Sequence, residues 1–127
     1  MSGDLKELDT IIRAATELAT SLGVLIFCRK MSEGRTIYID NFQRKTGKKG
    51  AGAEVLRFLM TSCDEAKIDL TLRSPTTNQK LADYYGQFGF VFYGPEKTES
   101  GKTFEYRGMV RASRSASLTK ELQDGPA

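Results

Sequence analysis

The residue types best suited to chemistry lie together at 47–53, where the chain reads Gly-Lys-Lys-Gly-Ala-Gly-Ala. The preceding residues, 36–42, are mostly β-branched and aromatic, which is typical of a strand. An amphipathic helix is predicted to begin near Ala51. Glycines between a strand and a helix let the backbone approach a ligand, and the free N–H groups of the helix's first turn favour phosphate. The segment therefore predicts a pyrophosphate-binding loop formed by Gly47, Lys48, Lys49, Gly50, Ala51, Gly52 and Ala53.

Positive charge is concentrated around this loop. The whole chain has a formal net charge of +3, but residues 29–57 hold eight lysines and arginines against three acids. Such a patch suits an anionic ligand, either a nucleotide-like cofactor or a nucleic acid, although a solvated basic loop would give the same pattern. Arg107, Arg111 and Arg114 form a second basic run, but no nucleic-acid-binding motif contains them, so a nucleic-acid partner is not expected.

The composition excludes several classes of protein. With 127 residues, 39% hydrophobic and 28% charged, the chain is sized for one domain, expected at 1–111 with a flexible tail at 112–127. No apolar run approaches the roughly 20 residues that span a bilayer, and the polar start is unlike a signal peptide, so we expect a cytoplasmic protein without a membrane segment. Histidine is absent, which excludes Ser-His and Cys-His nucleophile pairs and argues against a metal site. Cys28 and Cys63 lie in apolar patterns and are expected to be core residues.

The hydrophobic pattern predicts the order α-β-β-α-β-α-β-β, an α/β domain built on one mixed sheet. The loop at 47–53 supplies the crossover between parallel strands, and helices are expected on both faces of the sheet. The expected elements are a helix before Gly23, strands at 22–30 and 35–42 joined by a turn at 32–34, a helix from Ala51 to about Ala66, a strand at 68–73, a helix at 78–88, and strands at 90–93 and 103–111.

Two separated segments, in order, follow the motifs of one enzyme family. The first is a cofactor loop written Arg/Gln-x-x-Gly-x-Gly/Ala, for which Gly50-Ala51-Gly52 supplies the glycines and Gly47 stands where Arg or Gln is usual. The second is N-x-x-A-x-x-L-Y-x-x-x-G-F. Its matching residues here are Asn78, Tyr85, Gly89 and Phe90, with Leu81 in place of the alanine. From about residue 37 to 93 the chain therefore resembles the GNAT-type N-acyltransferases, in a compact form similar to those encoded by bacteriophages.

The resemblance implies a GNAT-like fold and an acyl-CoA ligand, acetyl-CoA or coenzyme A. Its pyrophosphate would sit on the glycine loop, and its pantetheine arm would pair with the splayed edge of the preceding strand at Asn41, Phe42 and Gln43. The family's asparagine, here Asn78, commonly contacts that arm, and its tyrosine, here Tyr85, commonly protonates the leaving thiolate. An aromatic residue covering the core edge is the structural alternative for Tyr85, and Tyr84 is expected to pack elsewhere.

Acyl transfer to an amine also needs a base and a donor for the oxyanion. Asp40, expected at the end of the central strand, is the first candidate for the base, acting directly or through water. Glu105, expected on the last strand, is the second, and a backbone N–H near Phe42 is the candidate oxyanion donor. Asp40 also has structural alternatives, since it could simply end its strand or contact Lys30 or Arg44.

Two functions of different classes follow from these residues. The first is an acetyl-CoA-dependent N-acetyltransferase acting on a primary amine, with a lysine of a protein, such as a host protein, as one acceptor. The second is a catalytically weak protein that binds CoA and acts by docking on and inhibiting a protein partner. The first is the leading interpretation, and the short segment ahead of the loop and the glycine at position 47 are the features that favour the second. The acceptor and the oligomeric state, including a homodimer, stay open.

Overall fold

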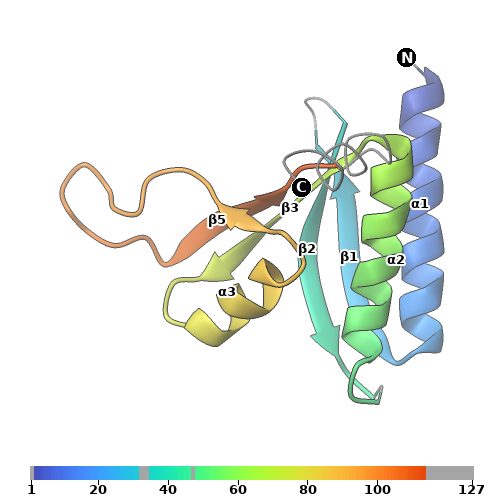
Figure 1. Ribbon diagram of the computed structural model, residues 1–127, viewed down its shortest axis with the longest axis horizontal. Coiled ribbons are helices and arrows are strands. Elements are labelled where there is room, and N and C mark those ends of the chain that lie inside the picture. The colour runs from blue at the N-terminus through green and yellow to red at the C-terminus, as the bar shows by residue number, and fades with distance from the viewer. Residues whose placement is uncertain (1, 32–34, 47, 114–127) are drawn as a thin grey trace, which may run out of the picture.

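The chain forms three helices and five strands within residues 2–31, 35–46 and 48–113, the part described by the computed structural model (Figure 1). Their order is the one predicted from the hydrophobic pattern. The elements are α1 (Ser2–Ser21), β1 (Val24–Lys30), β2 (Thr36–Arg44), α2 (Ala51–Ala66), β3 (Asp69–Pro75), α3 (Gln79–Gly86), β4 (Val91–Phe92) and β5 (Tyr106–Arg111).

The strands form one mixed sheet in the order β1-β2-β3-β5-β4. β2 and β3 are parallel and are joined through α2, whereas the β1–β2, β3–β5 and β4–β5 pairs are antiparallel. The predicted mixed sheet and the crossover at the glycine loop are therefore confirmed. The expectation of one crossover is wrong, because β3 and β4 are both antiparallel to β5, hence parallel to each other, and are joined through α3. β2 lies second in the sheet, so the expectation that it is the central strand is wrong; β3 occupies the middle position.

A β-bulge at Asp40 sets the shape of the sheet. Phe27 of β1 pairs with Asn41 and Cys28 pairs with Ile39, so Asp40 is left without a partner in the ladder. A bulge bends its strand and increases the local twist. β2 pairs with β3 at only three positions, from Thr36 to Tyr38, and then runs on to Arg44 without β3 beside it. The two parallel strands therefore separate just before the bulge (Figure 1).

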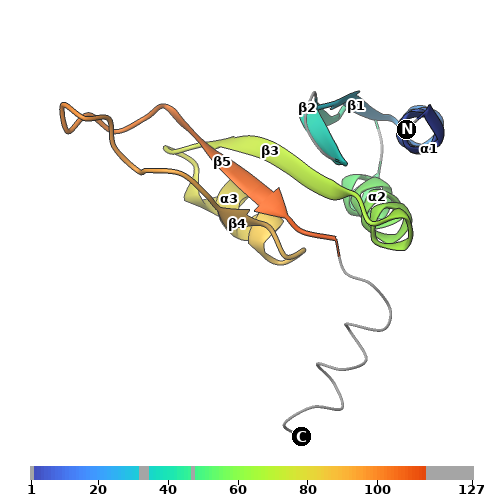
Figure 2. The same cartoon turned by 90° about the horizontal axis from the view of Figure 1, so that it is seen from above.

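All three helices bury residues in one core, on one face of the sheet. This core contains Ala15 of α1, Leu59 of α2 and Tyr85 of α3, packed with Ile37 and Leu72 of the strands. Figure 2 shows α2 and α3 on the same side of the sheet, with α1 beside α2 at the β1 edge. The expectation of helices on both faces is therefore wrong for the described residues. Two right-handed crossovers, through α2 and α3, run in the same direction along the sheet and so place both helices on one face.

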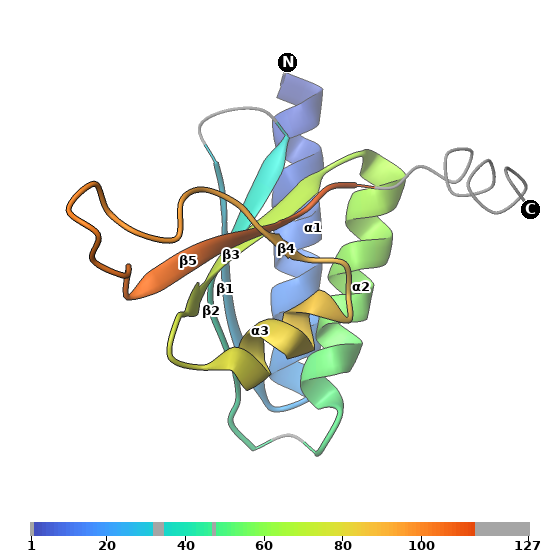
Figure 3. The same cartoon turned by 60° about the vertical axis from the view of Figure 1, so that its left-hand side comes forward.

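Element boundaries differ from the prediction at the C-terminal end. β5 begins at Tyr106 instead of Thr103, because its neighbour β3 ends at Pro75, the partner of Tyr106, and leaves residues 103–105 no strand to pair with. The loop between β4 and β5 projects from the body of the molecule and carries one isolated bridge, Lys97 to Thr103 (Figure 3). The expected turn at 32–34 lies outside the described residues, as does the expected tail except for residues 112 and 113. Within the described part, no helix combines the length and apolar character needed to cross a membrane.

Candidate functional site

A cavity of about 420 Å³ opens where β2, the glycine loop and α3 meet. The bend at Asp40 moves the end of β2 away from β3, and α3 lies close to β3 on the core side. The residues lining the cavity come from all three segments: Phe42, Gln43, Lys49, Gly50, Gly52, Ala53, Leu81, Tyr84 and Tyr85. The cavity thus brings together residues from the two sequence motifs, which are separated by a helix and a strand.

The glycine loop presents backbone N–H groups at the start of α2. Gly50 is the N-cap of the helix and has a φ of 94°, a left-handed conformation that favours glycine. Its carbonyl accepts the first helical bond from Glu54 N, and Ala51 N is bonded to Lys48 O. No backbone acceptor within the described residues is bonded to the N–H groups of Gly52 or Ala53, so both are available to an anion.

Gly52 has a different reason to be a glycine. Its backbone has no positive φ, and an added Cβ would lie 3.5 Å from Phe42 Cζ and 3.9 Å from Tyr84 Oη, which are ordinary contact distances. The fold itself therefore tolerates a side chain at Gly52. Only the close approach of a ligand to this turn would require a glycine here.

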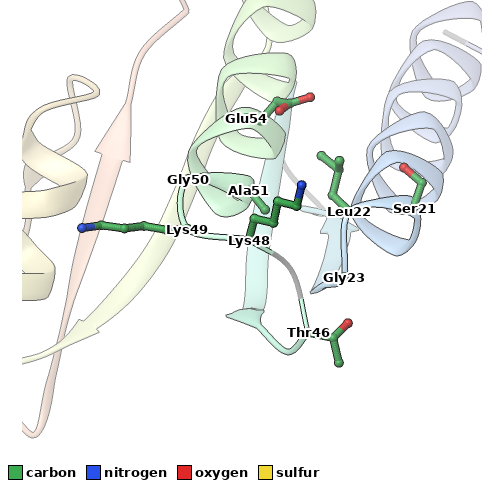
Figure 4. A pocket seen from close by; sticks show the side chains of 9 residues that line it. All are labelled: Ser21, Leu22, Gly23, Thr46, Lys48, Lys49, Gly50, Ala51 and Glu54. Carbon is green, nitrogen blue, oxygen red and sulfur yellow. The ribbon is translucent and has the colours of Figure 1, made fainter.

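A second cavity, of about 550 Å³, lies on the other side of the same loop, between the end of α1 and the start of α2. Lys49 and Gly50 line both cavities. In Figure 4 the side chains of Lys48 and Lys49 extend in opposite directions, so positive charge reaches both sides of the loop. Both lysines are exposed, and their attraction for an anion will depend on ionic strength.

Tyr84 and Tyr85 form the α3 wall of the cavity. Their rings meet edge to face with centroids 5.6 Å apart, and Tyr85 packs in the same way on Phe90 at 5.7 Å. Burial raises the pKa of Tyr85 to about 12, with a further contribution from Tyr84, so its hydroxyl stays protonated at neutral pH. Burial also raises the pKa of Tyr84, although Arg57 of α2 opposes this shift.

Asp40 does not line the cavity. It is exposed on β2 and, as the bulged residue, lies inside the strand, so the expectation that it ends the strand is wrong. Lys30, one alternative partner considered for it, forms an ion pair with Asp9 at 3.0 Å instead. The other candidate base, Glu105, is exposed in the loop before β5, where its carbonyl accepts a hydrogen bond from Thr76 N.

Five residues predicted to contact the ligand are not among those lining the cavity between β2 and α3. Lys48 and Ala51 line the second cavity instead. Asn41 is half-buried on β2, and its side-chain oxygen accepts a hydrogen bond from Gln43 Nε2. Asn78 is the N-cap of α3, and its side chain accepts from Leu81 N at 3.0 Å, which is a structural role. Gly47 lies outside the described residues.

The sequence reasoning missed Tyr84 and Leu81 as parts of the cavity wall. Leu81 and Tyr85 are four residues apart, and Leu81 and Tyr84 are three apart, so all three share one face of α3. This spacing was visible in the sequence. The expectation that Tyr84 packs elsewhere is wrong, because its ring lies beside that of Tyr85 and its hydroxyl lies near Gly52.

Among the described residues, the other reactive groups offer no competing site. Cys63 is buried and Cys28 is partly buried against the core, as predicted, and burial raises the pKa of each thiol to about 12. Neither thiol will be a nucleophile at neutral pH. The described residues contain no group of three or more His, Cys, Asp and Glu side chains that could hold a metal ion.

No protein-family model and no curated protein matches the sequence. Solved structures do match the fold. This chain superposes on Arabidopsis thaliana Naa50, solved with the bisubstrate analogue CoA-Ac-MVNAL, with a TM-score of 0.51 and 16% identity. The match covers 70% of this chain and 63% of the Naa50 chain. Ard1 from Thermoplasma volcanium gives a TM-score of 0.53 at 16% identity, covering 80% of this chain and 77% of the other. PH1933 from Pyrococcus horikoshii gives 0.55 at 16% identity, covering 83% and 73%.

The chain spans a little under two thirds of the Naa50 chain, and the identities are low, so these matches establish the fold and nothing further. The chain has the fold of the GNAT-type N-acetyltransferases.

Proposed function

We propose that the protein is an acetyl-CoA-dependent N-acetyltransferase that acetylates a primary amine. One observation carries the proposal: a single cavity joins the free end of β2, the N-terminus of α2 and the two tyrosines of α3. These parts come from separate segments of the chain, and a cavity that combines an anion site with a proton donor suits a phosphorylated acyl carrier. The Naa50 structure, which has the same fold, holds a CoA-based bisubstrate analogue.

The chain's own residues fit the parts of such a ligand. The N–H groups of Gly52 and Ala53, with Lys49 beside them, would hold the pyrophosphate. The side of β2 from Asn41 to Gln43 that faces away from β1 has no strand beside it, so its backbone can pair with the amides of a pantetheine arm. Gly50 has open space around its Cα, which leaves room for phosphate against the loop.

When bound, acetyl-CoA supplies a thioester whose carbonyl carbon is attacked by the acceptor nitrogen. Asp40 would take the proton that the amine must lose, directly or through a water molecule. Tyr85, protonated at neutral pH, would donate a proton to the departing sulfur. A backbone N–H near Phe42 would stabilise the oxyanion. A bulge beside the reacting atoms is a frequent feature of active sites and aims its side chain out of the regular ladder.

The test has two stages. Thermal denaturation is measured with and without CoA, since a ligand that binds only the folded state stabilises it by about 2.7 kcal/mol at 100 times its Kd. Release of free thiol from acetyl-CoA is then followed with a panel of amines, peptides and proteins. Absence of any stabilisation by millimolar CoA would refute the proposal at the first stage. Binding without transfer to any acceptor would refute the enzymatic part.

A second candidate function is a CoA-binding protein that acts by docking on a partner and inhibiting it. The observation that favours it is the burial of Tyr85, which raises its pKa to about 12. A thiol has an ordinary pKa of about 8.5, so proton transfer from Tyr85 to a thiolate is uphill. If CoA binds but no acetyl transfer occurs, affinity capture of a protein partner becomes the decisive measurement.

A further inference from the structure

The face of the sheet opposite the helices carries a cluster of arginine and tyrosine side chains. We call it the arginine–tyrosine face, and its members are Arg29, Tyr38, Arg73, Tyr93 and Tyr106. Arg29 of β1 pairs directly with Tyr38 of β2, and Tyr38 pairs with Thr71 of β3, two positions before Arg73. Strand alternation therefore places these side chains on the same side. None of the three helices covers this side, because all three pack on the other (Figure 2).

Aromatic rings hold the two guanidinium groups in place. The guanidinium carbon of Arg29 lies 4.9 Å from the centroid of the Tyr38 ring. Arg73 Nε donates a hydrogen bond of 3.1 Å to the hydroxyl of the same tyrosine, and its guanidinium carbon lies 6.0 Å from the Tyr106 ring. Both arginines are exposed, so aromatic contacts orient them without removing them from solvent.

None of the ion pairs found among the described residues includes Arg29 or Arg73. An arginine stacked on a ring still presents its in-plane N–H donors, which are arranged to bind a carboxylate. The side chains are thus pre-ordered to receive an acidic group from outside the chain.

Asp40 connects this face to the proposed chemistry. Asp40 is exposed on β2, two residues after Tyr38, the tyrosine to which Arg73 donates its hydrogen bond. That hydrogen bond raises the pKa of Arg73, and the charge of Asp40 makes a smaller contribution in the same direction. The cavity described above lies on the other, helix-covered side of the sheet, between β2 and α3. The two sides of the sheet meet at the gap between β2 and β3, and Asp40 lies at the edge of this gap.

We propose that the acceptor docks on the arginine–tyrosine face, and that it is a peptide segment in which acidic residues flank the amine that is acetylated. The description of this peptide as the acceptor rests on the proposed acetyltransferase function. Arg29 and Arg73 bind the flanking carboxylates, and Asp40 receives the proton of the amine. The rings of Tyr93 and Tyr106, exposed by about half, supply an apolar border for the peptide backbone.

The contacts of Tyr93 hold its ring against the sheet, which makes the apolar border flat. The ring of Tyr93 lies directly over Gly108, where a Cβ would come within 2.5 Å of its Cζ, and its hydroxyl lies 3.4 Å from Thr71 Oγ1. Only a glycine at position 108 lets this ring lie on the sheet. A flat surface with two fixed guanidinium groups matches an extended chain.

The charge on the face favours an acidic peptide over a nucleic acid. Two arginines stand against one carboxylate, Asp40, so the cluster is only weakly positive. A nucleic acid gains affinity from many phosphate contacts and would place its backbone against Asp40 as well. A peptide with separate carboxylates can contact the arginines while its amine contacts Asp40.

The experiment measures binding directly, without turnover. Fluorescently labelled peptides of equal length carry a central lysine flanked by glutamates, by glutamines or by lysines, and a single-stranded RNA of similar length serves as the polyanion. Fluorescence anisotropy is recorded for the wild type and for Arg29→Gln, Arg73→Gln and a control, Arg13→Gln. Arg13 is also exposed but lies on α1, far from this face.

We expect the glutamate peptide to bind about tenfold more tightly than the glutamine peptide. Arg29→Gln and Arg73→Gln should each lower the affinity for the glutamate peptide by about threefold to tenfold. Arg13→Gln should bind as the wild type does. Equal binding of all peptides, loss of affinity in Arg13→Gln, or tighter binding of the RNA would each overturn the proposal. If the glutamate peptide binds as expected but acetyl-CoA yields no product, the acetyltransferase function fails and the docking surface stands.

Discussion

Replacing Gly52 with alanine should change stability and ligand affinity in opposite directions. Gly52 is the second residue of α2 and has helical backbone angles, so alanine fits without strain. Its Cβ would make ordinary contacts with Phe42 and Tyr84, at 3.5 Å and 3.9 Å. Alanine inside a helix is favoured over glycine by about 1 kcal/mol. Because Gly52 lies in the first turn, we expect a gain between zero and about 1 kcal/mol in the free energy of unfolding.

The same methyl group projects into the cavity at the point where the N–H of Gly52 is free. A phosphate bonded to that N–H would approach the added carbon closely, or would have to give up the bond. We expect CoA affinity to fall at least about tenfold, which corresponds to about 1.4 kcal/mol. The protein would therefore become slightly more stable and bind its ligand less well.

The measurement combines chemical denaturation with isothermal titration of CoA, and Gly86→Ala is the matched control. Gly86 also lies in a helix, has no positive φ, and has nothing within 4 Å of the place its Cβ would occupy. The control should resemble Gly52→Ala in stability and the wild type in CoA affinity. If Gly52→Ala binds CoA as tightly as the wild type, no ligand approaches this turn and the assignment of the loop is wrong.

Further variants test the chemistry and the charge of the site. Tyr85→Phe keeps the ring packing, so CoA affinity should be unchanged while kcat falls about 10- to 1,000-fold; wild-type kcat in this variant would exclude Tyr85 as the acid. Since burial raises the pKa of Tyr85 to about 12, the donor stays protonated as pH rises, and no rate loss should come from it between about pH 7 and pH 10. Asp40→Asn should flatten the limb of the pH–rate profile that rises with pH, and an unchanged profile would exclude Asp40 as the base. Lys48→Ala and Lys49→Ala should weaken CoA binding in calorimetry at low salt, with a smaller difference from the wild type at high salt; an equal difference at both would mean that neither contact is electrostatic.

The element order could be predicted because local signals agreed with the final fold. Residues Val55, Leu56, Leu59 and Cys63 recur with helical spacing and are all fully buried in α2. In the same way the alternation of Leu70 and Leu72 predicted a strand. The start of β5 was harder to predict, since Thr103 and Phe104 have strand-forming side chains and only the absence of a neighbouring strand keeps them in the loop.

The loop motif predicted where an anion would sit, but it could not separate the roles of its glycines. Gly50 is required by its backbone angle, which a sequence does not reveal, whereas Gly52 has a helical angle and is open to alanine as far as the fold is concerned. The spacing in α3 located Tyr85 correctly on the cavity wall. It could not show that the side-chain oxygen of Asn78 already accepts a hydrogen bond from Leu81 N as the helix cap, since the same residue type serves both purposes.

The bulge at Asp40 explains why the site forms at all and why the sequence did not reveal it. A bulge is a mismatch between two strands, so it depends on the register of β1 against β2 and not on either segment alone. Read as a continuous strand, residues 36–42 would keep β2 beside β3 to its end and close the cavity. Because Asp40 is unpaired, β2 bends away and one of its edges stays free, while Asp40 itself stays exposed. The same irregular residue therefore lies where β2 leaves β3, between the cavity on one side of the sheet and the arginine–tyrosine face on the other.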